Sequence, residues 1–327
     1  MSKLFQSSIF PKLQHTLETL EPIDKDTALE MLNISNDDFP MVMGYANKLR
    51  VKTQGDKIRL CNIMNVKSGA CSEDCAFCAQ SAHHRSQTEI YPMIDGAKIA
   101  KTYSETPEEI KCFGLVSSGE RLSSKDLDVI VETFSKDRRL SRWSGSLGII
   151  SDEQLLKLKN AGMARYHHNI ETAKSFYPRI CTTHSWDSRR DMAMRVKKMG
   201  IELCCGGIMG VGESKEQRVE LAMELHEIGS DIIPMNFLVA IKGTKLENEP
   251  PTKAMDILKT IAMFRFVNPT ADIKLAGGRI HLGDLKAMAF FAGANSLITG
   301  TLLTTLNCNI ESDKKMLFDL ELEIEMR

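Results

Sequence analysis

Short apolar runs alternate with longer amphipathic stretches along most of the chain after residue 56. Short apolar runs are typical of buried strands, whereas apolar positions spaced three and four residues apart are typical of helices packed on one face. The pattern predicts strands over residues 58–66, 110–117, 140–149, 164–171, 201–209, 231–238, 272–276 and 294–298. It predicts helices over residues 126–135, 152–160, 187–199, 215–228, 252–266 and 284–291.

Several predicted helices run into a glycine before the next strand, as at Gly162, Gly200 and Gly229. A glycine there accepts the left-handed conformation that ends many helices, so the pattern indicates α-to-β connections. Eight strands alternating with helices favour a parallel sheet of the α/β class, closed as a TIM-type (βα)8 barrel. The alternative is a doubly wound open sheet, but no G-x-G-x-x-G follows the first predicted strand.

The chain is long enough for such a barrel and for additional segments at its ends, because 327 residues exceed the roughly 250 that a barrel requires. Residues 1–55 are expected to form an N-terminal helical extension, residues 56–310 the barrel, and residues 311–327 a C-terminal tail. In a barrel, the chemistry is expected at the C-terminal ends of the strands and in the loops that follow them.

The charge and the cysteine content indicate which partners, which cellular location and which role of the cysteines to expect. The chain carries 42 Lys+Arg and 43 Asp+Glu without a basic stripe, so neither nucleic acid nor a membrane is an expected partner. No apolar stretch approaches about 18 residues and the N-terminus lacks a signal-peptide core, so a cytoplasmic location is expected. In that compartment thiols stay reduced, and nine cysteines therefore predict metal ligands rather than disulfides.

The strongest chemical signal is the C-x3-C-x2-C loop of Cys71, Cys75 and Cys78, directly after the first predicted strand. Three thiolates can hold three irons of a cubane iron–sulfur cluster. The fourth iron then lacks a protein ligand, which leaves an open position of the kind that distinguishes catalytic metal sites from closed ones. The alternatives are a zinc site completed by His83 or His84, and an iron–sulfur electron carrier or scaffold that does no chemistry.

This spacing, with Phe77 before the third cysteine, resembles the signature of radical S-adenosylmethionine enzymes. The resemblance implies a 4Fe–4S cluster on the three cysteines, with S-adenosylmethionine chelating the open iron and releasing a 5′-deoxyadenosyl radical on reduction. It also implies that Phe77 and Ile208 border the adenine. Ile208 lies in the segment GGIMGVGE over residues 206–213, which looks like the G-x-I-x-G-x-x-E element of those enzymes.

Further motifs resemble the biotin synthase family and follow in that family's order over residues 58–310. They are YHHNIE at 166–171, CTTH at 181–184, CCGG at 204–207, PMN at 234–236, IKGT at 241–244 and LTT at 303–305. The resemblance implies a sulfurtransferase that inserts sulfur between two saturated carbons of dethiobiotin. It also implies a reductant such as flavodoxin or ferredoxin, iron–sulfur assembly proteins as partners, and a homodimer.

Side chains alternate along a strand, so His167, Asn169 and Glu171 are expected to share one face that points into the barrel. The resemblance implies that Asn169 and Glu171 contact the cofactor ribose. It likewise implies that His167 and Asn236 approach the ureido ring of the substrate. The family more often has Asn at residue 167 and Asp at residue 171, and both differences preserve hydrogen-bonding capacity.

Thr304 and Thr305, beyond the last predicted strand, are expected to bind the substrate's carboxylate tail through hydroxyl and backbone N–H groups. The alternative for each is a buried polar residue satisfied by a neighbour. No side chain is expected as a general acid or base, because homolytic C–H cleavage does not require one.

The sulfur donor of this family is an auxiliary iron–sulfur cluster, best known as a 2Fe–2S cluster on three cysteines and one arginine. Cys112 and Cys204 occupy two of those positions, but Ser144 replaces the third cysteine and Lys274 replaces the arginine. Serine is a harder and less acidic ligand than cysteine, and a lysine must lose its proton to bind iron. The ordinary ligand set is therefore incomplete.

Other cysteines of the chain can serve as cluster ligands in place of the two that are missing. The hypothesis is a remodelled auxiliary cluster, 2Fe–2S or larger, with an extra sulfide as the inserted atom. Its ligands would be Cys112, Cys204 and one or both of Cys61 and Cys181. Cys205 and Cys308 are expected to be small buried hydrophobes. The alternative function is a related radical S-adenosylmethionine mutase or maturase without sulfur insertion.

Overall fold

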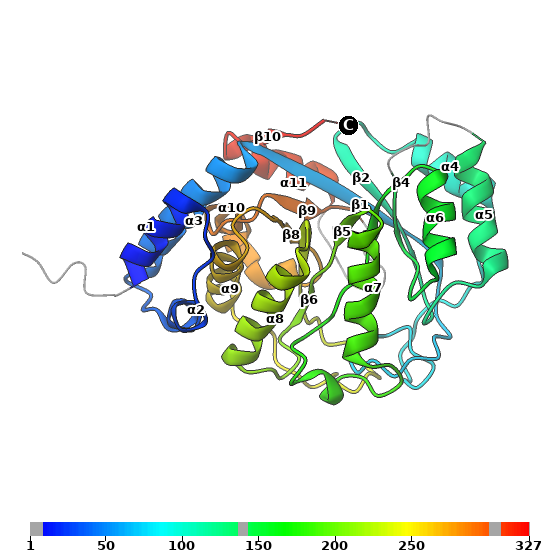
Figure 1. The fold of residues 1–327 in the computed structure, drawn as a ribbon, viewed down its shortest axis with the longest axis horizontal. Helices are drawn as coiled ribbons and strands as arrows, with labels where there is room; N and C mark the ends of the chain where they lie inside the picture. Colours follow the sequence, from blue (N-terminus) through cyan, green and yellow to red (C-terminus); the bar gives the residue numbers. More distant parts are fainter. Residues whose placement is uncertain (1–8, 137–142, 301–308, 327) are drawn as a thin grey trace, which may run out of the picture.

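The computed structural model describes residues 9–136, 143–300 and 309–326, and its strands form one closed parallel barrel (Figure 1). The strands are β1 (Lys57–Lys67), β2 (Ile110–Ser117), β3 (Trp143–Ser146), β4 (Met163–His167), β5 (Glu202–Cys204), β6 (Gly207–Met209), β7 (Ile232–Phe237), β8 (Asp272–Leu275), β9 (Ser296–Ile298) and β10 (Glu323–Ile324). They pair in the order β1-β2-β3-β4-β5-β7-β8-β9, β6 pairs with β7, and β9 pairs with β1 to close the ring. The predicted (βα)8 fold is confirmed.

Helices cover the outside of the barrel between the strands, as the hydrophobic periodicity predicts (Figure 1). They are α1 (Ile9–Thr19), α2 (Lys25–Asn33), α3 (Phe39–Gln54), α4 (Gly96–Ser104), α5 (Ser124–Ser135), α6 (Asp152–Asn160), α7 (Trp186–Lys198), α8 (Lys215–Ile228), α9 (Ala254–Val267), α10 (Met288–Phe291) and α11 (Ile310–Asp319). Capping boxes at Ser151 and Ser214 satisfy free backbone N–H groups and begin α6 and α8. Gly229 ends α8 in the left-handed conformation.

The strand predicted over residues 201–209 is two short strands, β5 and β6, separated at Cys205 and Gly206. Close backbone approach explains both glycines of the CCGG motif. A Cβ atom on Gly206 would lie 2.1 Å from the carbonyl oxygen of Pro234, and one on Gly207 would lie 2.2 Å from that of Glu171. Only glycine fits where these backbones meet.

The strand predicted over residues 164–171 also ends early, at His167. Beyond it, Glu171 has a φ of 67°, in the left-handed region that residues other than glycine seldom adopt. The bent segment is held by the Ile208 backbone N–H, which donates to the Glu171 carbonyl oxygen at 2.6 Å. Regular strand alternation therefore does not determine the side-chain directions of Asn169 and Glu171.

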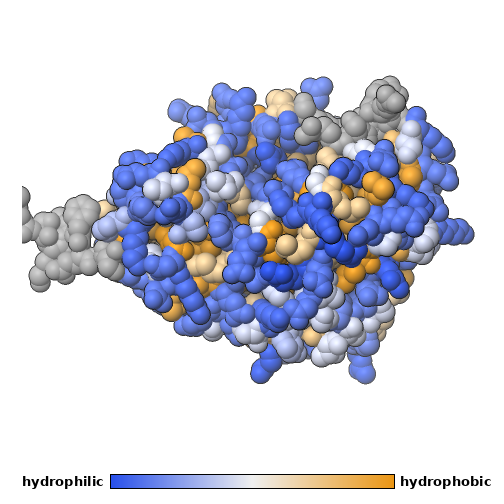
Figure 2. Space-filling model, viewed as in Figure 1, coloured by the Kyte–Doolittle hydropathy of each residue, from blue (hydrophilic) through white to orange (hydrophobic). Residues whose placement is uncertain are grey.

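The N-terminal helices and the C-terminal segment of the described chain meet at the start of β1. Helices α1 to α3 precede β1, and α2 and α3 contact α9, which is buried without interruption over residues 260–267 (Figure 1). The segment expected as a C-terminal tail contains α11 and β10, and β10 pairs with the start of β1. Figure 2 shows a mostly hydrophilic face with apolar side chains in small separate groups. Within the described residues, no helix combines the length and apolarity that a membrane crossing requires.

Candidate active site

The C-x3-C-x2-C loop follows β1 and is shaped by its own backbone hydrogen bonds. The Cys71 N–H donates to Gln80 O at 3.0 Å, and the Ala82 N–H donates to Cys71 O at 2.8 Å. The Cys78 N–H donates to Cys75 O at 2.9 Å. All three cysteines line one cavity of about 270 Å³ at the C-terminal ends of the strands. The loop thus presents its three thiols to a common space, as the spacing predicts.

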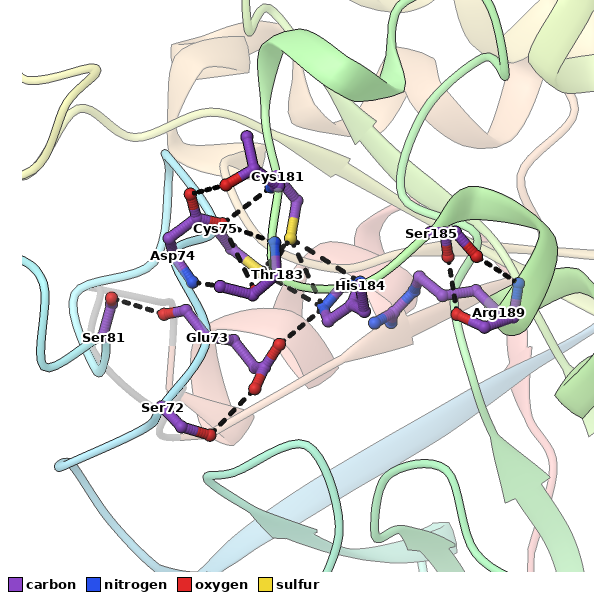
Figure 3. A network of polar contacts seen from close by, with 12 residues as sticks. Ser72, Glu73, Asp74, Cys75, Ser81, Cys181, Thr183, His184, Ser185 and Arg189 are labelled. Carbon is purple, nitrogen blue, oxygen red and sulfur yellow. Dashed lines mark hydrogen bonds and ion pairs between the residues drawn. The ribbon is translucent and has the colours of Figure 1, made fainter.

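A second loop, which contains Cys181 and His184, lies against the cluster loop (Figure 3). The Cys181 Sγ atom is 3.8 Å from Cys75 Sγ, and His184 Nε2 is also 3.8 Å from Cys75 Sγ. The hydroxyl of Tyr177 lies 2.7 Å from His184 Nδ1 and fixes the ring. The structure therefore places Cys181 at the three-cysteine loop, which differs from the expectation that it joins Cys112 and Cys204. The reason is that Cys181 lies well beyond the end of β4, above the barrel mouth.

Asp74 joins these two loops (Figure 3). Its Oδ1 accepts the Thr182 N–H at 2.8 Å and its Oδ2 accepts the Thr182 hydroxyl at 2.6 Å. Although burial opposes ionisation, the hydrogen bonds from Thr182 hold the pKa of Asp74 below its usual value. The carboxylate therefore stays charged near neutral pH and fixes the position of Cys75, the next residue.

The predicted cofactor residues meet beside the cysteine loop. Phe77, Asn169 and Glu171 line the cavity of the three cysteines and also an adjoining cavity of about 270 Å³, which Ile208 lines as well. The Asn169 Oδ1 atom accepts the Gly206 N–H at 3.1 Å, and its Nδ2 lies 3.4 Å from a Glu171 carboxylate oxygen. The two adjoining cavities are thus lined by apolar side chains, by the Asn169 amide and by the Glu171 carboxylate.

Arg189, on α7, is a member of this site that the sequence reasoning missed. Its Nη2 donates to Glu171 Oε1 at 2.8 Å, and its Nε donates to the Asn169 carbonyl oxygen at 2.6 Å. The guanidinium compensates the charge of the partly buried Glu171 carboxylate and holds it in place. Nothing in the local sequence pattern distinguishes this arginine from others on polar helix faces.

Glu213 shapes the glycine-rich turn that carries Ile208. Its two carboxylate oxygens accept the N–H groups of Gly210 at 2.9 Å and Val211 at 2.8 Å. Arg218 Nε donates to the same carboxylate at 2.6 Å. The Glu213 side chain is only 2% exposed, so its role is to hold the backbone of the turn rather than to meet solvent.

The two predicted substrate residues within the described chain face the same cavity from below. The Nδ2 of Asn236 donates to Gly207 O at 3.1 Å, and its Oδ1 accepts the Gly277 N–H at 2.9 Å. The His167 Nε2 atom is buried and finds no hydrogen-bond partner in the described part of the chain. Burial, followed by the charges of nearby lysine and arginine, lowers the pKa of His167, so the ring is neutral. Thr304 and Thr305 lie outside the described residues.

A second set of thiols lies deeper in the barrel. Cys61 on β1 and Cys112 on β2 are register partners, and they pack with Ala276 and Ile298, which also line the cavity above. Cys204, at the end of β5, is fully buried and interacts electrostatically with Cys112. Cys112 lies near the start of β2, below Ser117, which ends the strand and lines the cavity. These thiols therefore form a layer beneath the first site.

Charged side chains surround this deeper layer. Arg165 Nη1 donates to Cys112 Sγ at 2.8 Å, while Lys274 Nζ is fully buried and has no hydrogen-bond partner among residues 9–136, 143–300 and 309–326. A hydrogen bond from Cys61, and then the charges of Arg165 and Lys274, lower the pKa of Cys112 to about 5 against the effect of burial. Burial alone would lower the pKa of Lys274, but the surrounding thiols, first Cys61, raise it. Negative charge held by these thiols would therefore favour the ammonium form of Lys274.

Ser144, at the position of the missing cysteine, is engaged elsewhere. Its hydroxyl donates to the carbonyl oxygen of Phe113 on the neighbouring strand at 3.0 Å. The deeper thiol layer thus contains Cys61, Cys112 and Cys204, and neither Ser144 nor Cys181 belongs to it. Cys205 is buried in the main hydrophobic core, in accord with its expected role.

Comparison with known proteins identifies relatives over nearly the whole chain. Residues 65–225 match the Radical SAM superfamily model, and residues 234–323 match the Biotin and Thiamin Synthesis associated domain. A biotin synthase of Endomicrobium trichonymphae is 44% identical over 304 residues, which cover 93% of this chain and 94% of that protein. One from Clostridium perfringens (strain 13 / Type A) is 43% identical over 304 residues, covering 92% and 95%.

Solved structures share the architecture at much lower identity. A methylornithine synthase superposes with a TM-score of 0.83 at 19% identity, covering 96% of this chain and 97% of that chain. The FeFe-hydrogenase maturase from Carboxydothermus hydrogenoformans superposes with a TM-score of 0.80 at 14% identity, covering 96% and 78%. At these identities the likeness shows the fold alone.

Proposed function

The chain belongs to the biotin synthase family of radical S-adenosylmethionine enzymes, and from that premise we propose that it inserts sulfur into dethiobiotin. One observation carries the proposal: the three-cysteine loop lines one cavity together with Phe77, Asn169, Glu171, His167 and Asn236, directly above a second layer of buried thiols. A radical source, a substrate space and a sulfur source would then follow one another along the barrel axis.

The residues around the upper cavity fit a 4Fe–4S cluster with S-adenosylmethionine. Cys71, Cys75 and Cys78 offer three thiols to one space, and Asn169 and Glu171 add polar groups beside them. When bound, the cluster and S-adenosylmethionine supply a carbon-centred radical that can remove hydrogen from an unactivated C–H bond. Asn169 and Glu171 would bind the ribose hydroxyls, and Arg189 would hold the Glu171 carboxylate in its accepting orientation.

The lower wall of the cavity fits a neutral substrate head group. His167 is neutral, and its buried Nε2 atom has no hydrogen-bond partner in the described ranges, which suits a ureido group that donates and accepts hydrogen bonds without charge. Asn236 lies on the same wall, where its backbone hydrogen bonds fix its amide. These residues bind and orient the substrate and exclude water, and no side chain needs to move a proton.

The deeper layer fits an auxiliary iron–sulfur cluster held by Cys61, Cys112 and Cys204, because these buried thiols interact with the amino group of Lys274, which has no hydrogen-bond partner among the residues that the structure describes. Thiolates are the usual iron–sulfur ligands, and an anionic cluster would neutralise this cation. We further propose a cytoplasmic homodimer with residues 56–310 as its barrel domain, served by a flavodoxin- or ferredoxin-type reductant and by iron–sulfur assembly proteins.

Replacing Glu213 by Ala is expected to weaken S-adenosylmethionine binding by about 10- to 100-fold, the usual cost of losing a supporting residue. The substitution leaves the Gly210 and Val211 N–H groups and Arg218 without their acceptor, so the turn that carries Ile208 loses its shape. Equilibrium dialysis with the cluster-loaded enzyme measures the change. Glu216→Ala, an exposed change in the first turn of the helix α8 that follows Glu213, is the control and should bind normally. Equal affinity in both variants would contradict this role.

Replacing His167 by Asn is expected to preserve dethiobiotin affinity within a few-fold, whereas His167→Phe should weaken it about tenfold or more. Asparagine keeps a donor and an acceptor, while phenylalanine leaves a substrate polar group buried without a partner. Binding is measured by dethiobiotin titration in the presence of S-adenosylmethionine. If His167→Phe binds as well as His167→Asn, the ring does not contact the substrate.

The proposed activity is tested by an anaerobic single-turnover reaction with reductant, S-adenosylmethionine and dethiobiotin, analysed by mass spectrometry. Biotin formed together with 5′-deoxyadenosine is the expected result. Deoxyadenosine without biotin, from enzyme that contains both clusters, would overturn the assignment and favour a mutase or maturase. No deoxyadenosine at all would indicate an electron carrier or scaffold.

A further inference from the structure

Two buried cationic side chains, Arg165 on β4 and Lys274 on β8, interact with the deeper thiol layer, and the function proposed above gives Arg165 no role. Arg165 is braced on one side by Glu202, whose carboxylate accepts from Nε at 2.9 Å and from Nη2 at 2.6 Å. Its remaining Nη1 donates to Cys112 Sγ at 2.8 Å. The planar guanidinium is therefore fixed between a carboxylate and a thiol, an arrangement that a lysine would not reproduce.

Lys274 lies on the other side of the same thiols. Its side chain is fully buried, and its Nζ has no hydrogen-bond partner within the part of the chain that the structure describes. A buried ammonium needs a compensating charge, so a negatively charged group is expected against it. The groups that interact with it electrostatically are the thiols of Cys61, Cys204 and Cys112, together with the like charge of Arg165.

We propose that Arg165 and Lys274 are positioning residues for the auxiliary cluster, with Arg165 holding the Cys112 thiolate and Lys274 offering its ammonium to the inorganic sulfide of the cluster. The inference rests on the auxiliary cluster of the proposed function. Arg165 on β4 is then a second cation beside the one on β8, where this chain has Lys274 in place of the arginine that the family pattern implies. Ser144 does not replace the missing cysteine ligand, because its hydroxyl already donates to Phe113 O.

The physical reason for two cations is the charge of the group between them. A cluster with three thiolate ligands and an extra sulfide carries more negative charge than one with three thiolates and a neutral arginine ligand, because sulfide is an anion. Nearby positive charges lower the free energy of such a cluster and make its reduction easier, because reduction adds further negative charge. Removing either cation should therefore weaken iron binding and shift the reduction potential to more negative values.

The test uses the full-length protein with Cys71, Cys75 and Cys78 all replaced by Ala, so that only the auxiliary cluster can form. The protein is loaded anaerobically with ferrous iron and sulfide. Iron and acid-labile sulfide per chain, the Mössbauer spectrum, the midpoint potential and the rate of iron loss to a chelator are then measured. Arg165→Met and Lys274→Met are compared with Arg165→Lys and Lys274→Arg, which keep the charge.

We expect Arg165→Met and Lys274→Met to lose iron about 10- to 100-fold faster than the parent and to have a more negative potential. The charge-preserving variants should restore the potential at least in part. Arg195→Met is the control, because Arg195 also pairs with a carboxylate, Asp152, but on the outside of the barrel. It should keep the parent's iron content and potential.

Unchanged iron retention and potential in both methionine variants would overturn the inference while leaving the auxiliary cluster intact. No iron in the parent with the three Ala replacements would overturn the auxiliary cluster itself, which is a different failure. Circular dichroism of the iron-free proteins identifies variants that do not fold. If Arg165→Met does not fold, the test uses Lys274→Met and Glu202→Gln instead. A midpoint potential equal to that of the parent in both of these variants overturns the proposal.

Discussion

Enzyme with Cys75 replaced by Ala is expected to form no 5′-deoxyadenosine above background and to lose about four irons per chain. Among the described residues, Cys75 is one of three cysteines that line the cavity at the cluster loop, and a cubane cluster with two protein ligands is not retained. Iron analysis and single-turnover product analysis after anaerobic loading measure both effects. Iron that belongs to the deeper thiols should remain.

The neighbouring thiol of Cys181 provides a matched control for this prediction. Its Sγ is only 3.8 Å from Cys75 Sγ, yet it lies on the other loop and does not line the cavity. Cys181→Ala should therefore retain iron and deoxyadenosine formation. If Cys75→Ala stays active but the double variant Cys75→Ala/Cys181→Ala does not, Cys181 can replace Cys75 as a ligand, and the three-cysteine assignment is incomplete.

Replacing Arg279 by Met is expected to lower the free energy of unfolding by roughly 3–5 kcal/mol. Its guanidinium donates to both carboxylate oxygens of Asp313 at 2.7 and 2.6 Å, and both side chains are almost fully buried. The substitution leaves the Asp313 carboxylate buried without its counter-charge, and it disconnects α11 from the segment Arg279–Ala287. Urea denaturation of the iron-free protein measures the loss.

Two further variants separate the buried charge from the packing around it. In Arg279→Met/Asp313→Leu no charge remains buried, so much of the lost stability should return. Lys315→Met removes an exposed ion pair with Asp319 on the same helix and should change stability by less than about 1 kcal/mol. A loss in Arg279→Met no larger than that of Lys315→Met would show that the buried pair does not hold α11.

The elements that the sequence predicts well are those decided by neighbours along the chain. The helices over residues 152–160 and 215–228 are observed with the predicted bounds, because their caps and apolar periodicity are local. The cysteine loop is likewise local, since its three thiols lie within eight residues of one another and need only one turn of backbone to meet. Local signals of this kind do not depend on how the barrel closes.

The observed strands differ from the predicted ones where two backbone segments are in close contact. Glu171 has positive φ where its backbone bridges to Gly207 at the start of the neighbouring strand β6, and no local propensity indicates that contact. The expectation that Asn169 and Glu171 share a face with His167 is met in the cavity that all three line, but the bent segment after β4 produces it, not strand alternation.

By itself, the sequence determined the barrel class, the order of its elements and the loop of three cysteines, since all of these follow from residues close together in the chain. Only the tertiary structure decided the partners of the remaining charged and thiol groups. The contacting residues are far apart in the sequence: Cys181 and Cys75 by 106 residues, Arg165 and Cys112 by 53, and Arg189 and Glu171 by 18. Such pairs depend on the register in which the strands close, and register is a property of the whole barrel that no local pattern contains.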